Sequence, residues 1–330
     1  MSECVNIIGG GAWGTALAQV QARAGRGVTL WAREHAVVAA VNNVGENTPF
    51  LPGVELHRNI HATEDLGAAI DADILLLVVP TQYLRAILRE AGADRLAGKT
   101  LVLCAKGIEI ETGELLSRVV REVVPGAEIA VMSGPTFARE IAMDLPAAVT
   151  LAAPTIERAR DLAALLGSRT FRPYASDDVA GAEIGGAVKN VLAIACGVVA
   201  GRKYGDSARA ALLTRGMSEM MRLGALMGGR RETLMGMCGL GDLVLTATSM
   251  QSRNFSLGFA LGEGRKLADI MAERSAVTEG VHTAVAIRRL THARGISLPV
   301  LDAIHDLLHG DADVETVIDG LLSRPFGDEA

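Results

Sequence analysis

A glycine-rich turn near the N-terminus constrains the fold of this chain more than any other feature. An apolar run over residues 5–8 has the composition of a buried parallel strand, and a helical pattern begins soon after it. Between the two stand Gly9, Gly11 and Gly14 at G-x-G-x-x-G spacing. In this setting the first glycine permits a tight turn, the second lets the backbone approach a pyrophosphate, and the third lets the helix pack on the strand. Because the helix N-terminus offers N–H groups to phosphates, we predict a dinucleotide-binding turn.

Strand and helix patterns alternate along the first half of the chain. We expect strands at 27–33, near Ile60, at 73–80, 100–105, 129–132 and 147–152, and a short extended piece near Phe171. We expect helices at 34–43, 82–91, 114–123 and 155–166, with a helical turn from Asp65. This alternation predicts a Rossmann-like, doubly wound and mostly parallel sheet covered by helices.

The strand signals stop at about Ala180. Helical patterns follow at 187–200, 208–227, 255–262, 266–273, 282–294, 299–309 and 313–322, with Asp313 as an N-cap and Pro299 in a first turn. We therefore predict two domains: a Rossmann-like NAD(P)-binding domain over residues 1–179 and an all-α substrate and catalytic domain over residues 180–330. The sequence contains no long flexible linker, so we expect the domains to share a cleft.

Composition argues against several classes of protein. The net charge is −6 and there is no basic tract, so we expect no nucleic-acid partner. The four scattered cysteines form no C-x-x-C pair, which is typical of reduced thiols in a cytosolic protein. The first strand starts too early for a signal peptide. The apolar segment Gly185–Gly201 contains Lys189, and its uncharged remainder is too short to cross a bilayer. We expect a cytoplasmic protein without a membrane span.

Lysine is rare in this chain, because only five of the 32 basic residues are lysines. Lys189 nevertheless stands with Asn190 in a helical segment of small and apolar residues. Burying an ammonium without a partner costs roughly several kcal/mol, so a stable core would avoid it. One interpretation is a lysine at the helix start whose amine reaches solvent. The other is an amine whose pKa is lowered by its site, which makes it a general acid/base.

Four further segments carry polar groups that suit the same site. Lys106 follows a predicted strand at its carboxyl end, where ligands bind in such sheets, although a solvated loop lysine is the alternative. Asp242, in a Gly-rich loop, could tune an amine or could cap the next helix. At residues 133–138, backbone N–H groups and the Thr136 hydroxyl could hold a polar ligand. Arg253 suits a phosphate through bidentate contacts, with an ordinary surface arginine as the alternative.

The sequence contains no motif typical of a metal site, a phosphate-binding P-loop or a serine hydrolase. The seven histidines form no H-E-x-x-H motif and no close cluster with Cys or Asp, so we predict no metal site. There is no Walker A sequence and no G-x-S-x-G. Chemistry by a bound cofactor together with an amine therefore fits better than hydrolysis or phosphoryl transfer.

Taken together, these segments resemble the NAD(P)-dependent glycerol-3-phosphate dehydrogenases of bacteria. The resemblance is carried by Gly9–Ala16, Asn47–Gly53, Lys106-Gly107, Ser133–Glu140, Gly185–Asn190, Gly239–Leu245, Gln251–Asn254 and Glu279-Gly280. It implies a Rossmann-like N-terminal domain and an all-α C-terminal domain. It also implies reversible reduction of dihydroxyacetone phosphate to sn-glycerol 3-phosphate with NAD(P)H, for phospholipid synthesis, and a homodimer.

The resemblance further implies roles for single residues. Lys189 would be the general acid/base, with Lys106 beside it and Asp242 to orient it. Contacts to the substrate and its phosphate would come from Lys106, Gly134, Thr136, Lys189, Asp242, Ser252, Arg253 and Asn254. Contacts to the cofactor would come from Gly9, Gly11, Ala12, Trp13, Gly14, Arg33, Lys106, Ala138, Arg253, Val277 and Glu279. Ala12 stands where many relatives have Ser, so this chain lacks a phosphate-facing hydroxyl there.

The end of the second predicted strand bears on the choice of cofactor. An NAD-selective site would place an acid there to bind the ribose hydroxyls. Here Arg33 can meet a 2′-phosphate while Glu34 can serve a ribose, so we predict use of both NADP and NAD, with a preference for NADPH.

Two other functions stay open at this point. One is a lysine-dependent hydroxyacid dehydrogenase of similar two-domain plan, and the other is an inactive cofactor-sensing protein. Arg253 with Asn254 favours a phosphate ester over a carboxylate substrate. The presence of Lys106, Lys189 and Asp242 together counts against an inactive protein.

Overall fold

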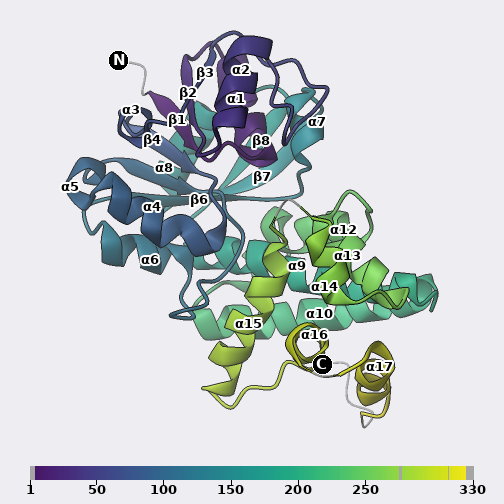
Figure 1. The fold of residues 1–330 in the computed structure, drawn as a ribbon. Coiled ribbons are helices and arrows are strands. Elements are labelled where there is room, and N and C mark those ends of the chain that lie inside the picture. The colour runs from purple at the N-terminus through teal and green to yellow at the C-terminus, as the bar shows by residue number, and fades with distance from the viewer. Residues whose placement is uncertain (1–3, 275–276, 311, 325–330) are drawn as a thin grey trace.

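The N-terminal domain is built on one eight-stranded sheet, drawn above the helical domain in Figure 1. The computed structural model describes residues 4–274, 277–310 and 312–324. The strands lie in the order β3-β2-β1-β4-β5-β6-β7-β8, and every neighbouring pair is parallel except β6 with β7. Their bounds are β1 Val5–Ile8, β2 Val28–Trp31, β3 Ile60–Thr63, β4 Ile74–Leu77, β5 Thr100–Leu103, β6 Glu128–Ser133, β7 Ala147–Ala152 and β8 Phe171–Ser176. The predicted doubly wound, mostly parallel sheet is confirmed.

Helices cover both faces of this sheet because its central strands are apolar on both sides. Ile7 and Leu76 pack with α1, α7 and α8, whereas Ile8 and Leu75 pack with α3, α4 and α6 on the opposite face. Successive strand residues point to opposite faces, and a parallel sheet buries both. The elements are α1 Ala12–Arg23, α2 His35–Val44, α3 Leu66–Ala69, a 3-10 turn Thr81–Tyr83, α4 Leu84–Ala91, α5 Ala93–Leu96, α6 Leu116–Val123, α7 Ala138–Ala142 and α8 Ile156–Leu166. Helices α5 and α7 were not predicted, because four or five residues are too few to display a helical period.

Over its described residues the second half of the chain is helical, as predicted. Its elements are α9 Val179–Gly201, α10 Asp206–Met227, α11 Arg231–Leu234, a π-helical turn Met237–Gly241, α12 Asp242–Ala247, α13 Arg253–Gly262, α14 Leu267–Ala272, α15 Glu279–His292, α16 Pro299–His309 and α17 Val314–Leu322. Pro299 lies in the first turn of α16, and the Asp313 side chain caps α17 by accepting from the Thr316 N–H. Both predicted features are therefore confirmed.

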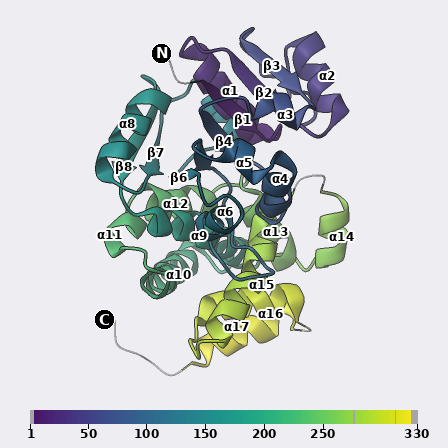
Figure 2. The same cartoon turned by 90° about the vertical axis from the view of Figure 1, so that its left-hand side faces the viewer.

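Helix α9 is the centre of this domain and contacts α6, α10, α12 and α13, which surround it in Figure 2. Small residues let α9 and α13 approach closely. A Cβ at Gly197 would lie 2.2 Å from Phe255 O, and a Cβ at Gly258 would lie 2.0 Å from Ile194 O. The two backbones are therefore in contact, which brings the first turn of α13 beside the middle of α9.

Among the described residues, α9 is the one helix long and apolar enough to cross a membrane. However, 89% of its apolar window is buried inside the protein. All residues from Gly181 to Val198 are buried, including Lys189 and Asn190. A lipid-spanning helix would not place these polar groups against other helices of a packed core, so α9 is a core helix.

Candidate active site

The glycine turn has the geometry that a dinucleotide-binding turn requires. Gly9 has a φ of +130°, which L side chains rarely adopt, and a Cβ there would lie 2.7 Å from the carbonyl group of Val78. A Cβ at Gly14 would lie 1.9 Å from Gly9 O, so α1 rests directly on the turn. Gly11 faces open space, and no side chain caps α1. The first N–H groups of α1 are therefore available to a pyrophosphate.

Three residues from distant segments meet at the carboxyl edge of the sheet. Lys106 follows β5, Lys189 lies in the middle of α9, and Asp242 begins α12. The two oxygens of Asp242 are divided between the amines: Oδ2 lies 2.6 Å from Lys106 Nζ, and Oδ1 lies 3.0 Å from Lys189 Nζ. The carboxylate is fully buried. One acid thus holds two ammonium groups side by side.

Burial and charge act against each other on these groups. Burial lowers the pKa of Lys189 to about 8, although Asp242 raises it, and the nearby Lys106 charge lowers it further. Burial disfavours the ionised Asp242, but Lys106 and Lys189 outweigh this effect and hold the pKa of the carboxyl below its usual value. The Lys189 amine does not reach solvent from a helix start, because it lies ten positions inside α9 and is 7% exposed. The arrangement suits an amine that takes up and releases a proton near neutral pH.

The segment that carries Asp242 differs from the prediction. It is not a Gly-rich loop but a π-helical turn that runs directly into α12. Glycines in the turn and in α9 permit close packing. A Cβ at Gly239 in the turn would lie 1.9 Å from Leu234 O, and a Cβ at Gly185 on α9 would lie 2.7 Å from Cys238 O. The turn is thereby pressed against α9, which brings the Asp242 carboxylate within reach of Lys189. π-Helical turns are often found at functional sites.

Thr246 is a member of the site that sequence reasoning missed. Its Oγ1 accepts a 2.8 Å hydrogen bond from Lys189 Nζ and donates over 3.2 Å to Asp242 Oδ1. Thr246 lies four residues after Asp242, on the same face of α12. A helix predicted over 242–247 would have placed Thr246 one turn after Asp242 on the same face. The prediction of a loop there gave no reason to pair the two residues.

A chain of amide groups ties the site to the remaining helices. Asn190 Nδ2 donates to Lys106 O over 3.3 Å, and Asn254 Nδ2 donates to Asn190 Oδ1 over 2.9 Å. Asn254 Oδ1 in turn accepts from the Gly280 N–H at 3.0 Å. Both polar atoms of the Asn254 side chain are thus engaged within the protein. The chain fixes α9, α13 and α15 relative to the loop that carries Lys106.

The first turn of α13 carries the predicted phosphate-binding residues. The Ser252 hydroxyl caps this helix by accepting from the Phe255 N–H. The Arg253 guanidinium makes no hydrogen bond or ion pair to any other described residue. Desolvation lowers the pKa of Arg253, against the raising effect of Glu279. An unpaired guanidinium at a helix N-terminus is well suited to an anion.

The loop after β6 borders Lys106. Lys106 Nζ donates to Gly134 O over 3.0 Å, and the Thr136 hydroxyl contacts the same oxygen at 3.4 Å. A Cβ at Gly134 would lie 2.7 Å from Val149 Cα, so only glycine fits between β6 and β7 here. Ala138 follows at the start of α7. Gly134 therefore lies at the lysine centre, and Thr136 lies next to it.

Buried polar atoms without partners mark the side of the site expected to hold the cofactor. Glu279 Oε1 accepts from the Thr81 N–H at 3.0 Å, whereas Glu279 Oε2 and Trp13 Nε1 have no hydrogen-bond partner among the described residues. A Cβ at Gly107 would lie 3.1 Å from Glu279 Oε2. Burial also raises the pKa of Glu279. A buried carboxylate oxygen and indole N–H left unpaired fit a polar ligand such as a dinucleotide.

Other predicted cofactor residues lie further from the lysine centre. Arg33 follows β2, is exposed, and makes no hydrogen bond or ion pair within the described structure. Ala12 begins α1 at the glycine turn. Val277 is half-buried shortly before α15. Arg33 and Ala12 would serve different parts of an extended cofactor, since the carboxyl ends of β1 and β2 are adjacent.

No group of three or more His, Cys, Asp or Glu suited to a metal occurs among the residues that the structure describes.

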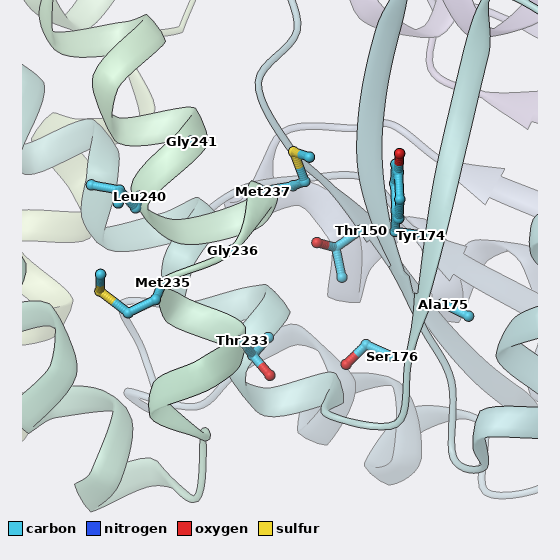
Figure 3. Close-up of a pocket in the computed structure, with 10 residues that line it drawn as sticks. All are labelled: Thr150, Tyr174, Ala175, Ser176, Thr233, Met235, Gly236, Met237, Leu240 and Gly241. Carbon is cyan, nitrogen blue, oxygen red and sulfur yellow. The ribbon is translucent and has the colours of Figure 1, made fainter.

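A surface pocket of about 450 Å³ lies between β8 and the π-helical turn, as Figure 3 shows. It is lined by Thr150, Tyr174, Ala175, Ser176, Thr233, Met235, Gly236, Met237, Leu240 and Gly241. None of the predicted site residues lines it, so the pocket lies beside the lysine centre and not within it.

The chain matches one enzyme family over both domains. Residues 4–159 match the family described as NAD-dependent glycerol-3-phosphate dehydrogenase N-terminus, and residues 178–319 match its C-terminus. The glycerol-3-phosphate dehydrogenase (NAD(P)+) of Rhodospirillum rubrum is 58% identical over 98% of this chain and 93% of its own length. That of Parvibaculum lavamentivorans is 54% identical over 98% of both. The crystal structure of glycerol-3-phosphate dehydrogenase from Coxiella burnetii superposes with a TM-score of 0.93 at 38% identity, covering 98% of this chain and 99% of that one.

Proposed function

The chain belongs to the NAD-dependent glycerol-3-phosphate dehydrogenase family, and we propose that it reversibly reduces dihydroxyacetone phosphate to sn-glycerol 3-phosphate with NAD(P)H. The product would feed glycerophospholipid synthesis. The observation that carries the proposal is the buried Asp242 carboxylate shared by Lys106 and Lys189, at the sheet edge where the cofactor domain meets the helical domain. It supports a centre for proton transfer beside a bound nicotinamide.

Lys189 is the group to which we assign proton transfer. The nicotinamide, when bound, supplies or accepts the hydride. During reduction the Lys189 ammonium donates its proton to the carbonyl oxygen as negative charge develops there, and during oxidation the neutral amine takes the proton back. A pKa of about 8 leaves both protonation states accessible near neutral pH. Asp242 and Thr246 keep the amine oriented, and Lys106 adds positive charge beside it.

Recognition of the phosphate is assigned to the first turn of α13 and the loop after β6. Arg253 would bind the phosphate, with Ser252 and Asn254 beside it, while Gly134 and Thr136 lie next to Lys106. Holding a remote phosphate fixes the carbonyl carbon in front of the cofactor and contributes orientation. The unpaired guanidinium of Arg253 has the geometry to bind a phosphate through two hydrogen bonds.

Further details belong to the same proposal. We expect a preference for NADPH over NADH, because exposed Arg33 is available to a 2′-phosphate. The change from β8, ending at Ser176, to α9, beginning at Val179, supports domains over residues 1–179 and 180–330. A cytoplasmic location and a homodimer are expected from the family.

One assay tests the proposal directly. The purified protein is mixed with NADPH or NADH and dihydroxyacetone phosphate, and the absorbance of the reduced nicotinamide is followed. We expect oxidation of the cofactor that depends on the ketone phosphate, and slower or no oxidation with unphosphorylated dihydroxyacetone. Absence of oxidation with either cofactor would overturn the proposed activity.

A further inference from the structure

Arg274 lies outside the predicted set of site residues, and its guanidinium forms hydrogen bonds to the first turn of α13. Its Nη1 donates a 2.6 Å hydrogen bond to Arg253 O, and its Nη2 donates a 3.1 Å hydrogen bond to Ser256 Oγ. Ser256 Oγ itself contacts Arg253 O at 3.2 Å. The guanidinium therefore holds the backbone at the residue that presents the predicted phosphate ligand. A two-pronged, charge-assisted contact of this kind is stronger than a neutral hydrogen bond.

The charge of Arg274 has only a distant compensation from Glu273. Among the described residues Arg274 forms no ion pair, because the adjacent Glu273 is engaged with Arg265 at 2.6 Å. Desolvation lowers the pKa of Arg274, and the Arg253 charge lowers it further. The positive charges of Arg253 and Arg274 therefore act on each other, and neither guanidinium forms an ion pair with a described carboxylate. Such an arrangement costs electrostatic energy in the free protein and is relieved by an anion.

Arg274 also lies where two parts of the site meet. It lies just before the segment that leads through Thr278 to α15, whose first residue is Glu279. The first turn of α13 is already tied to α9 and α15 through Asn254. Arg274 adds a third tie, through its hydrogen bonds to Arg253 O and Ser256 Oγ.

We propose that Arg274 is a positioning residue for the substrate phosphate: it fixes the first turn of α13, and with it Arg253, and adds a second positive charge to the phosphate site. This inference rests on the proposed function, since it assigns a residue to the phosphate end of that substrate. Arg274 does not touch the reacting atoms. Its removal therefore weakens substrate binding and leaves the proton-transfer centre of Lys189 and Asp242 intact.

The test compares Arg274→Met, Arg274→Lys and the wild type. Methionine keeps the length and apolar packing of the side chain but removes the charge and both hydrogen bonds. For Arg274→Met we expect the KM for dihydroxyacetone phosphate to rise about tenfold, the size expected for a lost charge-assisted contact, with kcat and the KM for NADPH within about twofold. Arg274→Lys keeps the charge without the two-pronged geometry and should fall between the two. Inorganic phosphate, used as a competitive inhibitor, should weaken by the same factor as the substrate.

Arg209→Met is the matched control, because Arg209 forms an exposed ion pair with Asp206 at the start of α10. It should leave every constant unchanged. If the wild type reduces dihydroxyacetone phosphate but Arg274→Met keeps its KM and its inhibition by phosphate, the inference about Arg274 is wrong while the proposed function stands. A fall in kcat at unchanged KM would also contradict it. A wild type without activity would count against the proposed function instead.

Discussion

The glycine turn and the lysine–carboxylate centre are assembled in opposite ways. The turn is local: Gly9 and Gly14 contact each other within one short segment, and the turn packs on the residues that follow β4 and β2. The centre joins side chains up to 136 positions apart, from the loop after β5, from α9 and from α12. In the proposed function, pyrophosphate binding depends on the backbone geometry of this one turn, whereas proton transfer depends on how two domains pack. A single side-chain change should therefore disable the centre and leave the turn intact.

Removing the Lys189 amine should give the largest effect and separates the two regions most cleanly. We expect Lys189→Ala to lower kcat about a thousandfold, within the range for loss of a general acid/base. The dissociation constant for NADPH should hardly change, because no contact of the glycine turn involves Lys189. Steady-state kinetics and calorimetric titration with NADPH measure the two quantities. Lys266→Ala, at an exposed lysine before α14, is the control. Wild-type turnover in Lys189→Ala would refute the assignment.

Neutralising Asp242 should damage the centre through stability as well as rate. Asp242→Asn leaves two ammonium groups facing each other in a buried site, and breaking a buried ion pair in this way costs about 3–5 kcal/mol of unfolding free energy. Without the carboxylate, the pKa of Lys189 should fall below its present value of about 8, because the one group that raises it is gone. The pH profile of reduction should then shift to lower pH.

Urea unfolding and the pH dependence of kcat measure both consequences. The exposed pair between Arg202 and Glu315 provides the control, since Glu315→Gln should cost about 0–1 kcal/mol. An Asp242→Asn variant as stable as this control, with an unshifted pH profile, would mean that the carboxylate does not hold the two amines together.

The same contrast explains what could be predicted from the sequence. The fold could, because buried strands such as Ile74–Leu77 are continuous apolar runs, and because glycine spacing at residues 9–14 has one compact geometric meaning. Lys189 and Asp242 could be named as partners because an unpaired amine is costly in a core. Their actual contact, with one oxygen for each lysine, arises only when α9 and the π-helical turn pack together.

The failures have a physical cause as well. Gly239 and Gly241 suggested a loop because glycine lowers helix propensity, yet Leu234 O approaches Gly239 so closely that a Cβ would not fit at that position. Tertiary packing outweighed local propensity. Thr246 was lost with that error, because its role depends on lying one helical turn after Asp242. Arg274 carries no sequence signal at all, since its contacts are to a backbone oxygen and a hydroxyl eighteen or more positions away.

The helix that carries Lys189 also contains a buried acid that lacks an ion-pair partner among the described residues. Glu183 on α9 accepts from the Ser117 N–H at 2.8 Å, its Oε2 has no partner in the described structure, and it forms no ion pair there. Burial raises its pKa to about 7. Because the folded-state pKa lies above the unfolded value, Glu183 is compatible with the fold at acid pH, and stability is lost as pH rises from about 4.5 through about 7.

Glu183→Gln should remove this loss, since glutamine keeps an oxygen for the Ser117 N–H and cannot ionise. Relative to the wild type, we expect the variant to gain about 2 kcal/mol of unfolding free energy between pH 5 and pH 8. Urea unfolding at the two pH values measures the gain, and Glu315→Gln should show none. A pH-independent difference between Glu183→Gln and the wild type would show that Glu183 does not titrate in this range.

The smallest effect is expected at the local, cofactor-binding side. Arg33 is exposed after β2 and is not held by other described residues, so its loss should leave the fold and kcat unchanged. Arg33→Ala should raise the KM for NADPH about fivefold, because one exposed charge-assisted contact to a 2′-phosphate is lost, and should leave the KM for NADH within about twofold. Kinetics with both cofactors test this, with Arg118→Ala on α6 as the control. Equal losses for both cofactors would mean that Arg33 contributes general positive charge.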